Sequence, residues 1–432
     1  MIMCRLGQHG DRISGIGLRT WSSTIQVVAR LAVVLAVLTG AAQSQTYNVI
    51  HNFTGGQDGA TPMAGLTMDE SGNLYGTAAY GGTFGGPCGI LGCGTVFRLT
   101  IRNGGWVLTP LYSFTGGSDG ANPVANVTVG ADGSLYGSTY LGGGACAGDG
   151  CGTIFNLKPP ASACKAALCP WNESVIHRFA RVDGEGPAGA VLLDPSGDVY
   201  GTTIDGGGLS GGTVFELLPS GGGWMGRIIY NSYGYPGSGV LRDNSGNLDG
   251  TAFTGGNGQG SIYQLVPAGS GWIAANLYNF TNGSDGGYPV AGLILDQSGN
   301  LYGSTSSGGA GNGGTVFQLA PSNGNWILNT LYSFTGPQNG KFVVGPVGSL
   351  AMDQAGALYG TALADGAYGY GSVFKLIPGN DGWTYISLHD FTGGSDGGSP
   401  YSNLVFDAHG NLYGTTSTGG ANGLGVVFEI KP

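Results

Sequence analysis

The chain has 432 residues, of which 90 are glycine, and only 9% of the residues are charged. With 41% hydrophobic and 10% aromatic residues it holds enough apolar side chain for a packed core, which excludes a disordered linker. The glycines follow no Gly-X-Y period, so collagen is excluded. Helical bundles are disfavoured because each glycine destabilises a helix interior by about 1 kcal/mol relative to alanine. The composition predicts an all-β protein with many tight turns.

The first 44 residues have the pattern of a secretory signal peptide. Four arginines precede an apolar run at residues 31–40, and small residues follow it up to Ser44. This order is typical of cleavage before Gln45. An uncleaved membrane anchor is the alternative, although the apolar run is shorter than the ~20 residues that span a bilayer. We expect a secreted or periplasmic protein with a signal peptide at 1–44, a single mature domain at 45–432 and no membrane segment after cleavage.

The charge of the mature chain excludes one class of partner. Removing residues 1–44 leaves 11 Lys and Arg against 24 Asp and Glu, a net charge of −13. The remaining basic residues are scattered singly, whereas a protein that binds phosphate backbones needs a basic stripe. We therefore expect no nucleic-acid partner.

A short phrase, Leu-Tyr-Gly followed by Thr or Ser, recurs every 49 to 64 residues and defines seven units. Each unit carries four segments with strand character, and a Ser-Gly-Asn type of turn joins the first two. Four strands in each of seven units predict a seven-bladed β-propeller. A parallel β-helix is the alternative, but its rungs are shorter than these units. The middle residues of the phrase are Tyr75, Tyr136, Tyr200, Asp249, Tyr302, Tyr359 and Tyr413.

The two ends of the mature chain complement each other. Residues 47–53 match the fourth strand of a unit before any first strand has occurred, and the last unit stops after its third strand at 426–430. We therefore expect the N-terminal strand to become the outer strand of the last blade. This pairing would close the ring and remove an exposed sheet edge.

Three further positions recur with the repeat. A tryptophan stands eight residues before the end of the fourth strand in six units, and we expect it to pack between neighbouring blades. An aspartate opens the turn between the first two strands, where its side chain can accept backbone hydrogen bonds. His51, His177 and His389 occupy fourth-strand positions that hold tyrosine in other units, so we interpret them as tyrosine substitutes on an outer strand.

The phrases Gly-Asn-Leu-Tyr-Gly-Thr-Thr, Gly-Thr-Val-Phe-x-Leu and Leu-Tyr-x-Phe-Thr-Gly-Gly-Ser-Asp-Gly resemble the GloVer tandem repeat of bacterial secreted proteins. The resemblance covers residues 47–432. It implies a secreted β-propeller and carries over no reaction or ligand. Members of that family end in varied surface anchors. No such segment follows the last repeat of this sequence, so we do not expect the resemblance to extend to surface attachment.

Six cysteines follow the leader and form three local pairs: Cys88 with Cys93, Cys146 with Cys151, and Cys164 with Cys169. An even number at local spacing in an exported chain indicates disulfides. Such small rings stabilise by only about 2 kcal/mol each, so they would pin loops. Zinc is the alternative, but these loops hold no histidine and the spacing is atypical. We expect no metal and no cofactor.

Unit four departs furthest from the repeat. In other units the Phe-Thr-Gly-Gly-Ser-Asp-Gly loop lies on the same face as the cysteine loops, and its aspartate is typical of a turn. In unit four this loop reads Ser-Tyr-Gly-Tyr-Pro-Gly-Ser-Gly and carries Tyr233 and Tyr235. Such tyrosines suit stacking on sugar rings or contact with a protein. The same unit has Asp249 in place of tyrosine, and we expect this carboxylate to face solvent or a partner.

Two functions fit these features. The first is an exported, non-enzymatic binding or scaffold propeller, a monomer that recognises a polysaccharide or a cell-surface protein near Tyr233 and Tyr235. The alternative is an extracellular polysaccharide-acting lyase or glycoside hydrolase, for which Asp183, Glu185 and Asp205 of unit three are the candidate carboxylates.

Overall fold

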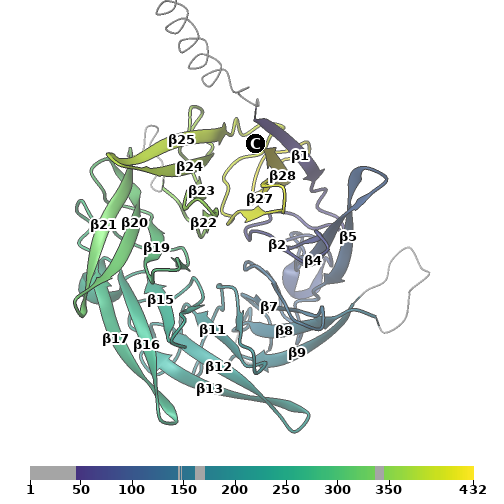
Figure 1. Ribbon diagram of the computed structural model, residues 1–432. Coiled ribbons are helices and arrows are strands. Elements are labelled where there is room, and N and C mark those ends of the chain that lie inside the picture. Colours follow the sequence, from purple (N-terminus) through teal and green to yellow (C-terminus); the bar gives the residue numbers. More distant parts are fainter. Residues whose placement is uncertain (1–44, 145, 147, 161–170, 336–344) are drawn as a thin grey trace, which may run out of the picture. The chain divides into compact units, whose positions relative to one another are not determined.

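A computed structural model describes residues 45–144, 146, 148–160, 171–335 and 345–432. Within it, Thr46–Lys431 forms one compact unit. Seven four-stranded antiparallel sheets follow one another around a ring (Figure 1). The predicted seven-bladed propeller is therefore confirmed. The predicted signal segment and the third cysteine pair, Cys164 and Cys169, lie outside the described residues.

Each blade begins with two inner strands. The innermost strands have two residues each: β2 (Thr67–Met68), β6 (Thr128–Val129), β10 (Leu192–Leu193), β14 (Leu241–Arg242), β18 (Ile294–Leu295), β22 (Ala351–Met352) and β26 (Val405–Phe406). The second strands contain the Leu-Tyr-Gly phrase: β3 (Leu74–Ala78), β7 (Leu135–Thr139), β11 (Val199–Thr203), β15 (Leu248–Ala252), β19 (Leu301–Thr305), β23 (Leu358–Ala362) and β27 (Leu412–Thr416).

Two longer strands complete each blade on the outside. The third strands are β4 (Thr95–Arg102), β8 (Thr153–Lys158), β12 (Thr213–Ser220), β16 (Ser261–Ala268), β20 (Asn312–Ser322), β24 (Ser372–Gly379) and β28 (Val426–Lys431). The fourth strands are β5 (Gly105–Ser113), β9 (Asn172–Arg178), β13 (Gly223–Asn231), β17 (Gly271–Asn279), β21 (Asn325–Thr335), β25 (Gly382–Asp390) and, from the start of the chain, β1 (Thr46–Asn52).

The Leu-Tyr-Gly strands form the core of the blades because both of their faces are covered. All five residues of β3 are buried, and so are all five of β15. The glycine of the phrase is needed for close packing: a Cβ on Gly76 would lie 2.6 Å from the ring of Phe97 on the neighbouring strand. The third-strand phenylalanine thus packs directly over the glycine backbone.

The repeated aspartate makes the predicted turn. Asp69 Oδ1 accepts hydrogen bonds from the backbone N–H groups of Ser71 and Asn73, both at 2.9 Å. Its other oxygen accepts from the hydroxyl of Tyr75 at 3.1 Å. The carboxylate therefore fixes the hairpin and positions the tyrosine of the Leu-Tyr-Gly phrase.

The chain closes its ring as predicted. Strand β1 pairs antiparallel with β28, and the last sheet has the order β1-β28-β27-β26, seen where the purple and yellow strands meet in Figure 1. Tyr47 of β1 stacks on His389 of the preceding blade with ring centroids 3.8 Å apart. The closing strand therefore contributes packing as well as a hydrogen-bonded edge.

The tryptophans pack between blades as expected. Among the described residues, four tryptophan rings make edge-on contacts, each with the Leu-Tyr-Gly tyrosine of the preceding blade. The pairs are Trp106 with Tyr413, Trp171 with Tyr75, Trp224 with Tyr136, and Trp272 with Tyr200, at centroid distances of 5.5, 6.3, 6.4 and 6.1 Å.

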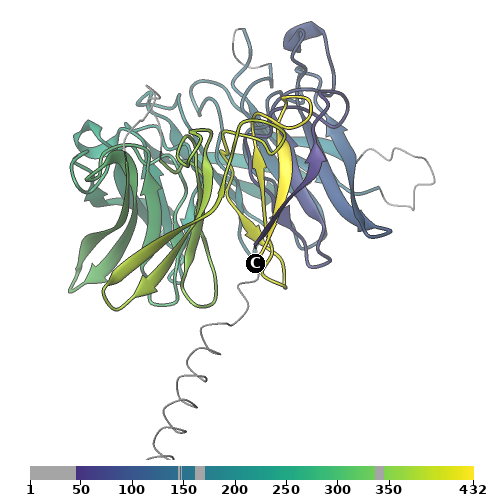
Figure 2. The same cartoon turned by 90° about the horizontal axis from the view of Figure 1, so that it is seen from above.

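Helical structure in the described residues is limited to single turns, η1 (Gly86–Cys88) and α2 (Gly255–Gly258). Both belong to loops between the second and third strands of a blade. Figure 2 views the ring from its side, with long loops at one end and strand hairpins at the other. In the described part of the chain, no helix combines the length and the apolar character that crossing a membrane requires.

Candidate functional site

The loops between blades and the loops between second and third strands gather on one face, which we call the loop face. Gly116, in the loop that leaves blade 1, lies against the sulfur atoms of Cys88 and Cys93 in the neighbouring loop. Cys88 and Cys93 form a disulfide with their Cα atoms 5.1 Å apart, and Cys146 and Cys151 form another at 5.5 Å. Two of the three predicted disulfides are thus confirmed, and they fit an oxidising compartment.

The aspartates of the Phe-Thr-Gly-Gly-Ser-Asp-Gly loops stabilise the conformation of those loops. Asp396 accepts hydrogen bonds from the backbone N–H and the hydroxyl of Thr392, and from His389 Nε2 at 3.1 Å. Burial alone would raise the pKa of Asp396, but these bonds outweigh it and hold the pKa below its ordinary value. The outer-strand histidines therefore replace tyrosine as partners of the loop acid, as the matching bond from Tyr278 to Asp285 shows.

The three candidate carboxylates of unit three divide into two groups. Asp183 is the loop acid of its blade, because it lies 3.0 Å from His177 Nε2 and caps the backbone N–H of Ala180 at 2.8 Å. Glu185 and Asp205 instead form a two-stranded bridge through their backbones. Their side chains meet Arg181, at 3.5 and 3.9 Å.

The bridge of Glu185 and Asp205 therefore presents an arginine with two acids on the loop face. Arg181 is well exposed, at 69% of its side chain. The neighbouring Tyr140 has a raised pKa, first because it is partly buried and second because Glu185 and Asp205 are negative. Asp183 does not join this cluster, so the structure brings only two of the three candidate acids together.

Tyr233 and Tyr235 lie on the loop face between blades 3 and 4. Their side chains are 73% and 41% exposed. The loop is held by a bond from the Tyr235 N–H to the Gly211 carbonyl at 2.8 Å, and the Tyr235 carbonyl accepts from the Phe253 N–H at 3.3 Å. Phe253 is 38% exposed and packs on Tyr288 with centroids 5.2 Å apart. The two predicted tyrosines thus belong to a larger group of aromatic side chains.

This group continues along the neighbouring loops. Leu209, in the loop that supports Tyr233, is 39% exposed, and Val182 beside Arg181 is 78% exposed. We call the set over blades 3 and 4 the aromatic strip: Val182, Leu209, Tyr233, Tyr235, Phe253 and Tyr288. Sequence reasoning identified Tyr233 and Tyr235 but missed the other four residues, although each follows from a unit-specific change in a loop of units three to five.

The prediction that Asp249 faces solvent or a partner was wrong. Its side chain is 1% exposed, because β15 is covered on both faces. Gln264 Nε2 donates to Asp249 Oδ1 at 2.9 Å, while Oδ2 has no hydrogen-bond partner among the described residues. Burial raises the pKa of Asp249 to about 7, although the bond from Gln264 opposes this and the charge of Asp243 adds to it.

A second perturbed acid was not singled out by the sequence. Glu173 on β9 has its pKa raised to about 7 by burial and by the negative charge of Asp119, against the opposing charge of Arg178. It lies in the interface of blades 1 and 2, close enough to Tyr112 to influence that hydroxyl. The sequence did contain a signal for this residue, because a glutamate here replaces an apolar residue of the outer strand.

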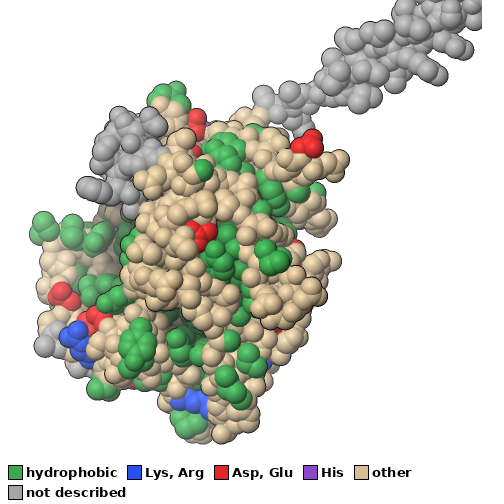
Figure 3. Space-filling view, turned by 90° about the vertical axis from the view of Figure 1, so that its left-hand side faces the viewer, with side chains coloured by type: hydrophobic (Ala, Val, Ile, Leu, Met, Phe, Trp, Pro, Cys, Tyr) green, Lys and Arg blue, Asp and Glu red, His purple; other side chains and the backbone are tan. Residues whose placement is uncertain are grey.

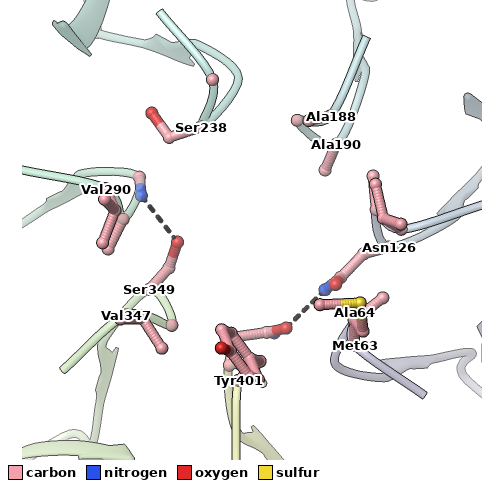
Figure 4. Close-up of a pocket in the computed structure, with 18 residues that line it drawn as sticks. Met63, Ala64, Asn126, Ala188, Ala190, Ser238, Val290, Val347, Ser349 and Tyr401 are labelled. Carbon is pink, nitrogen blue, oxygen red and sulfur yellow. Dashed lines mark hydrogen bonds between the residues drawn. The ribbon is translucent and has the colours of Figure 1, made fainter. Parts of the chain in front are cut away.

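The central channel is lined by the segments that precede the seven innermost strands (Figure 4). Its cavity of about 390 Å³ has no charged residue in its lining. Asn126 Nδ2 donates to Asn403 Oδ1 at 2.5 Å, and Ser349 Oγ accepts from the Gly292 N–H at 3.0 Å, so these polar side chains mainly bind neighbouring segments. The channel could have been found from the proline and small residues that open each unit.

No group of three or more His, Cys, Asp or Glu side chains that could hold a metal ion occurs among the described residues. Charged side chains are also sparse on the side of the ring shown in Figure 3, where tan and green predominate. The side of the ring in this view therefore offers mainly uncharged groups.

The sequence model of the Gloeobacter/Verrucomicrobia repeat matches residues 36–234 and again residues 235–432. The chain belongs to this repeat family. The resemblance drawn from the repeated phrases is thereby confirmed, and the family members' repeat folds here as propeller blades. No curated protein matches the chain.

Solved structures resemble the repeat protein only in outline. A Thermus thermophilus protein named as a putative oxidoreductase (glucose dehydrogenase) has 15% identity and a TM-score of 0.45, covering 90% of this chain and 100% of that one. A Dyadobacter fermentans protein of unknown function has 10% identity and a TM-score of 0.44, covering 90% and 98%. TolB from Acinetobacter baumannii has 13% identity and a TM-score of 0.39, covering 68% and 60%. No activity follows from likenesses this distant.

Proposed function

We propose that this repeat-family propeller is an exported, non-enzymatic binding protein that recognises a neutral polysaccharide with the aromatic strip over blades 3 and 4. The observation that supports this most is the exposure of Tyr233 and Tyr235, at 73% and 41%, in the loop that has lost the repeat's acid. Tyrosine rings offer flat apolar faces with hydroxyl tips, which suit the faces and hydroxyls of sugar rings.

The surroundings of the strip favour an uncharged ligand. Arg181 faces two acids, Glu185 and Asp205, so this cluster carries one net negative charge and repels acidic ligands. The loops beneath the tyrosines are held by backbone hydrogen bonds, so the rings are presented on a supported surface. A supported aromatic surface loses little conformational entropy when a ligand binds.

The test is a screen of the purified protein against neutral plant and bacterial glycans, followed by Tyr233→Ala with Tyr235→Ala. We expect affinity to fall by at least about tenfold, which is 1.4 kcal/mol, while the free energy of unfolding changes by less than about 0.5 kcal/mol. The matched control is Tyr368→Ala with Tyr370→Ala, a pair on blade 6 with exposures of 59% and 46%.

Three outcomes would count against the proposal. Equal loss in both pairs of variants would show non-specific adhesion, and undiminished binding after loss of Tyr233 and Tyr235 would refute the placement. Release of sugars or unsaturated products would favour the lyase or hydrolase alternative, in which case Glu185→Gln and Asp205→Asn become the informative variants.

A further inference from the structure

Neighbouring blades are joined by a recurring pair of aromatic rings. The phenylalanine that closes the fourth strand of one blade packs on the phenylalanine in the third strand of the next, with centroids 5.1 to 5.5 Å apart in six interfaces. The pairs are Phe53 with Phe97, Phe114 with Phe155, Phe179 with Phe215, Phe280 with Phe317, Phe334 with Phe374, and Phe391 with Phe428.

The interface of blades 3 and 4 lacks this pair. Ser232 stands at the position that the closing phenylalanine holds in the other blades, and it lines the same cavity as Tyr263 in the third strand of blade 4. Replacing phenylalanine with serine removes a whole ring from a buried position. In a closely packed interface the neighbours fill such a gap only in part.

A second position in the same interface also holds a small side chain. Ala274 pairs with Leu265 in blade 4, and the equivalent pair in blade 6 is Tyr385 with Leu376. Tyr385 fills its own interface by stacking on Tyr332 at 4.5 Å. Blade 4 has only a methyl group at this position, so two rings that blades 5 and 6 place in their interface are absent here.

These absences leave a cavity of about 430 Å³ lined by both small residues, Ser232 and Ala274. Tyr230 leans towards Tyr263, with centroids 5.6 Å apart and planes at 32°, and fills part of the space. The remaining cavity is larger than the ~150 Å³ engineered apolar cavity that admits benzene. It also falls within the range typical of ligand pockets, roughly 300–1,000 Å³.

The walls of the cavity define the chemistry that it can accept. Tyr230, Tyr233 and Tyr263 supply ring faces, and the other lining residues are Gly, Ala, Ser and Asn, none of them charged. Ser232 Oγ accepts from the Gly234 N–H at 2.9 Å, which leaves its hydroxyl proton to donate. An aromatic ring with one small polar substituent could pack against the tyrosine rings and accept a hydrogen bond from the Ser232 hydroxyl.

We propose that the cavity between blades 3 and 4 binds a small neutral molecule through a single aromatic ring of the phenol class. The interface of blades 5 and 6 shows the packing that such a ring would restore: Tyr385 stacks on Tyr332 and, at 5.9 Å and 22°, on Phe374. The corresponding residues in this cavity are Tyr230 and Tyr263. The inference goes beyond saccharide binding and does not depend on it.

Phenol itself is the probe. Saturation-transfer NMR and calorimetry on the purified protein should show binding, and Ser232→Phe and Ala274→Tyr, which restore side chains found in other interfaces, should each raise Kd at least about tenfold. Ser232→Ala is the matched control, because it keeps the cavity and should bind phenol within a few-fold of the wild type. A melting curve of each variant checks that it is folded.

The proposal is overturned if the wild type does not bind phenol up to the solubility limit, or if folded Ala274→Tyr binds it as well as the wild type. Ala274→Tyr also separates this site from the saccharide site, since Ala274 lies on β17 and outside the aromatic strip. It should retain glycan binding while losing phenol, and Tyr235→Ala should do the reverse.

Discussion

Asp249 should make the protein less stable as the pH rises, and Asp249→Asn should remove that dependence. Burial raises the pKa of Asp249 in the folded protein to about 7 from an ordinary value of 3.8. Between these values the folded state holds a proton that the unfolded state has released. The unfolded state therefore binds fewer protons than the folded state. The free energy of unfolding falls progressively as the pH rises from about 4 to about 7, because the folded state must then bury an ionised Asp249.

The size of the effect follows from the shift. A difference of about three pH units corresponds to about 4 kcal/mol at 1.36 kcal/mol per unit, a large part of a typical unfolding free energy of roughly 5–15 kcal/mol. Asparagine keeps the shape and can still accept the hydrogen bond that Gln264 gives to Asp249, but it cannot ionise. The variant should therefore gain stability over the wild type by up to about 4 kcal/mol above pH ~7, and little below pH ~4.

Denaturant unfolding of both proteins at several pH values between about 4 and 9 measures this difference. Asp381→Asn is the control, because it removes the same formal charge from an exposed residue of the turn between β24 and β25. Parallel stability curves for Asp249→Asn and the wild type would refute the reasoning, since they would mean that Asp249 ionises as readily in the folded chain as in the unfolded one.

Two further predictions concern the ring and its loops. A chain that starts at Gly55 loses β1 together with Tyr47 and the fully buried Phe53. Because aromatic-to-alanine changes in cores each cost about 3–5 kcal/mol, this chain should have a lower melting temperature, and it should associate through the exposed edge of β28, which light scattering would detect. A monomeric protein with an unchanged melting temperature would contradict ring closure. Replacing Cys88 and Cys93 with serine should lower the free energy of unfolding by only about 2 kcal/mol, and loss of the folded state in circular dichroism would show that the disulfide supports more than its loop.

Much of the fold could be predicted because each structural requirement is repeated in the sequence. The glycine of Leu-Tyr-Gly is required by the ring of Phe97 over Gly76, and the trimmed ends predict the pairing of β1 with β28. Asp249 was misjudged because a strand was assumed to have a solvent face, whereas β15 is buried on both sides. The sequence of a single unit does not indicate which of its residues face those of the next unit across a blade interface.

The candidate site was predictable in part for the same reason. Tyr233 and Tyr235 could be recognised as departures from a repeated loop, but the aromatic strip depends on contacts such as Phe253 with Tyr288 between different units. Prediction of the cavity would have required knowing which residues of different units face each other. Ser232 was visible as an exception in the sequence, yet its meaning depends on Ala274, which is brought opposite by the ring.

Hydrogen–deuterium exchange with and without a bound glycan tests most directly whether blades 3 and 4 carry the binding site. Backbone N–H groups of Gly207, Gly212 and Tyr235 hold the loops beneath the aromatic strip, so their exchange should slow when a ligand covers it. The account predicts protection confined to the loops that carry the aromatic strip, at residues 181–184, 204–212, 232–239, 253–258 and 286–289. Protection confined to the loops of blades 1 and 6, or to the strand hairpins on the opposite face, would contradict it.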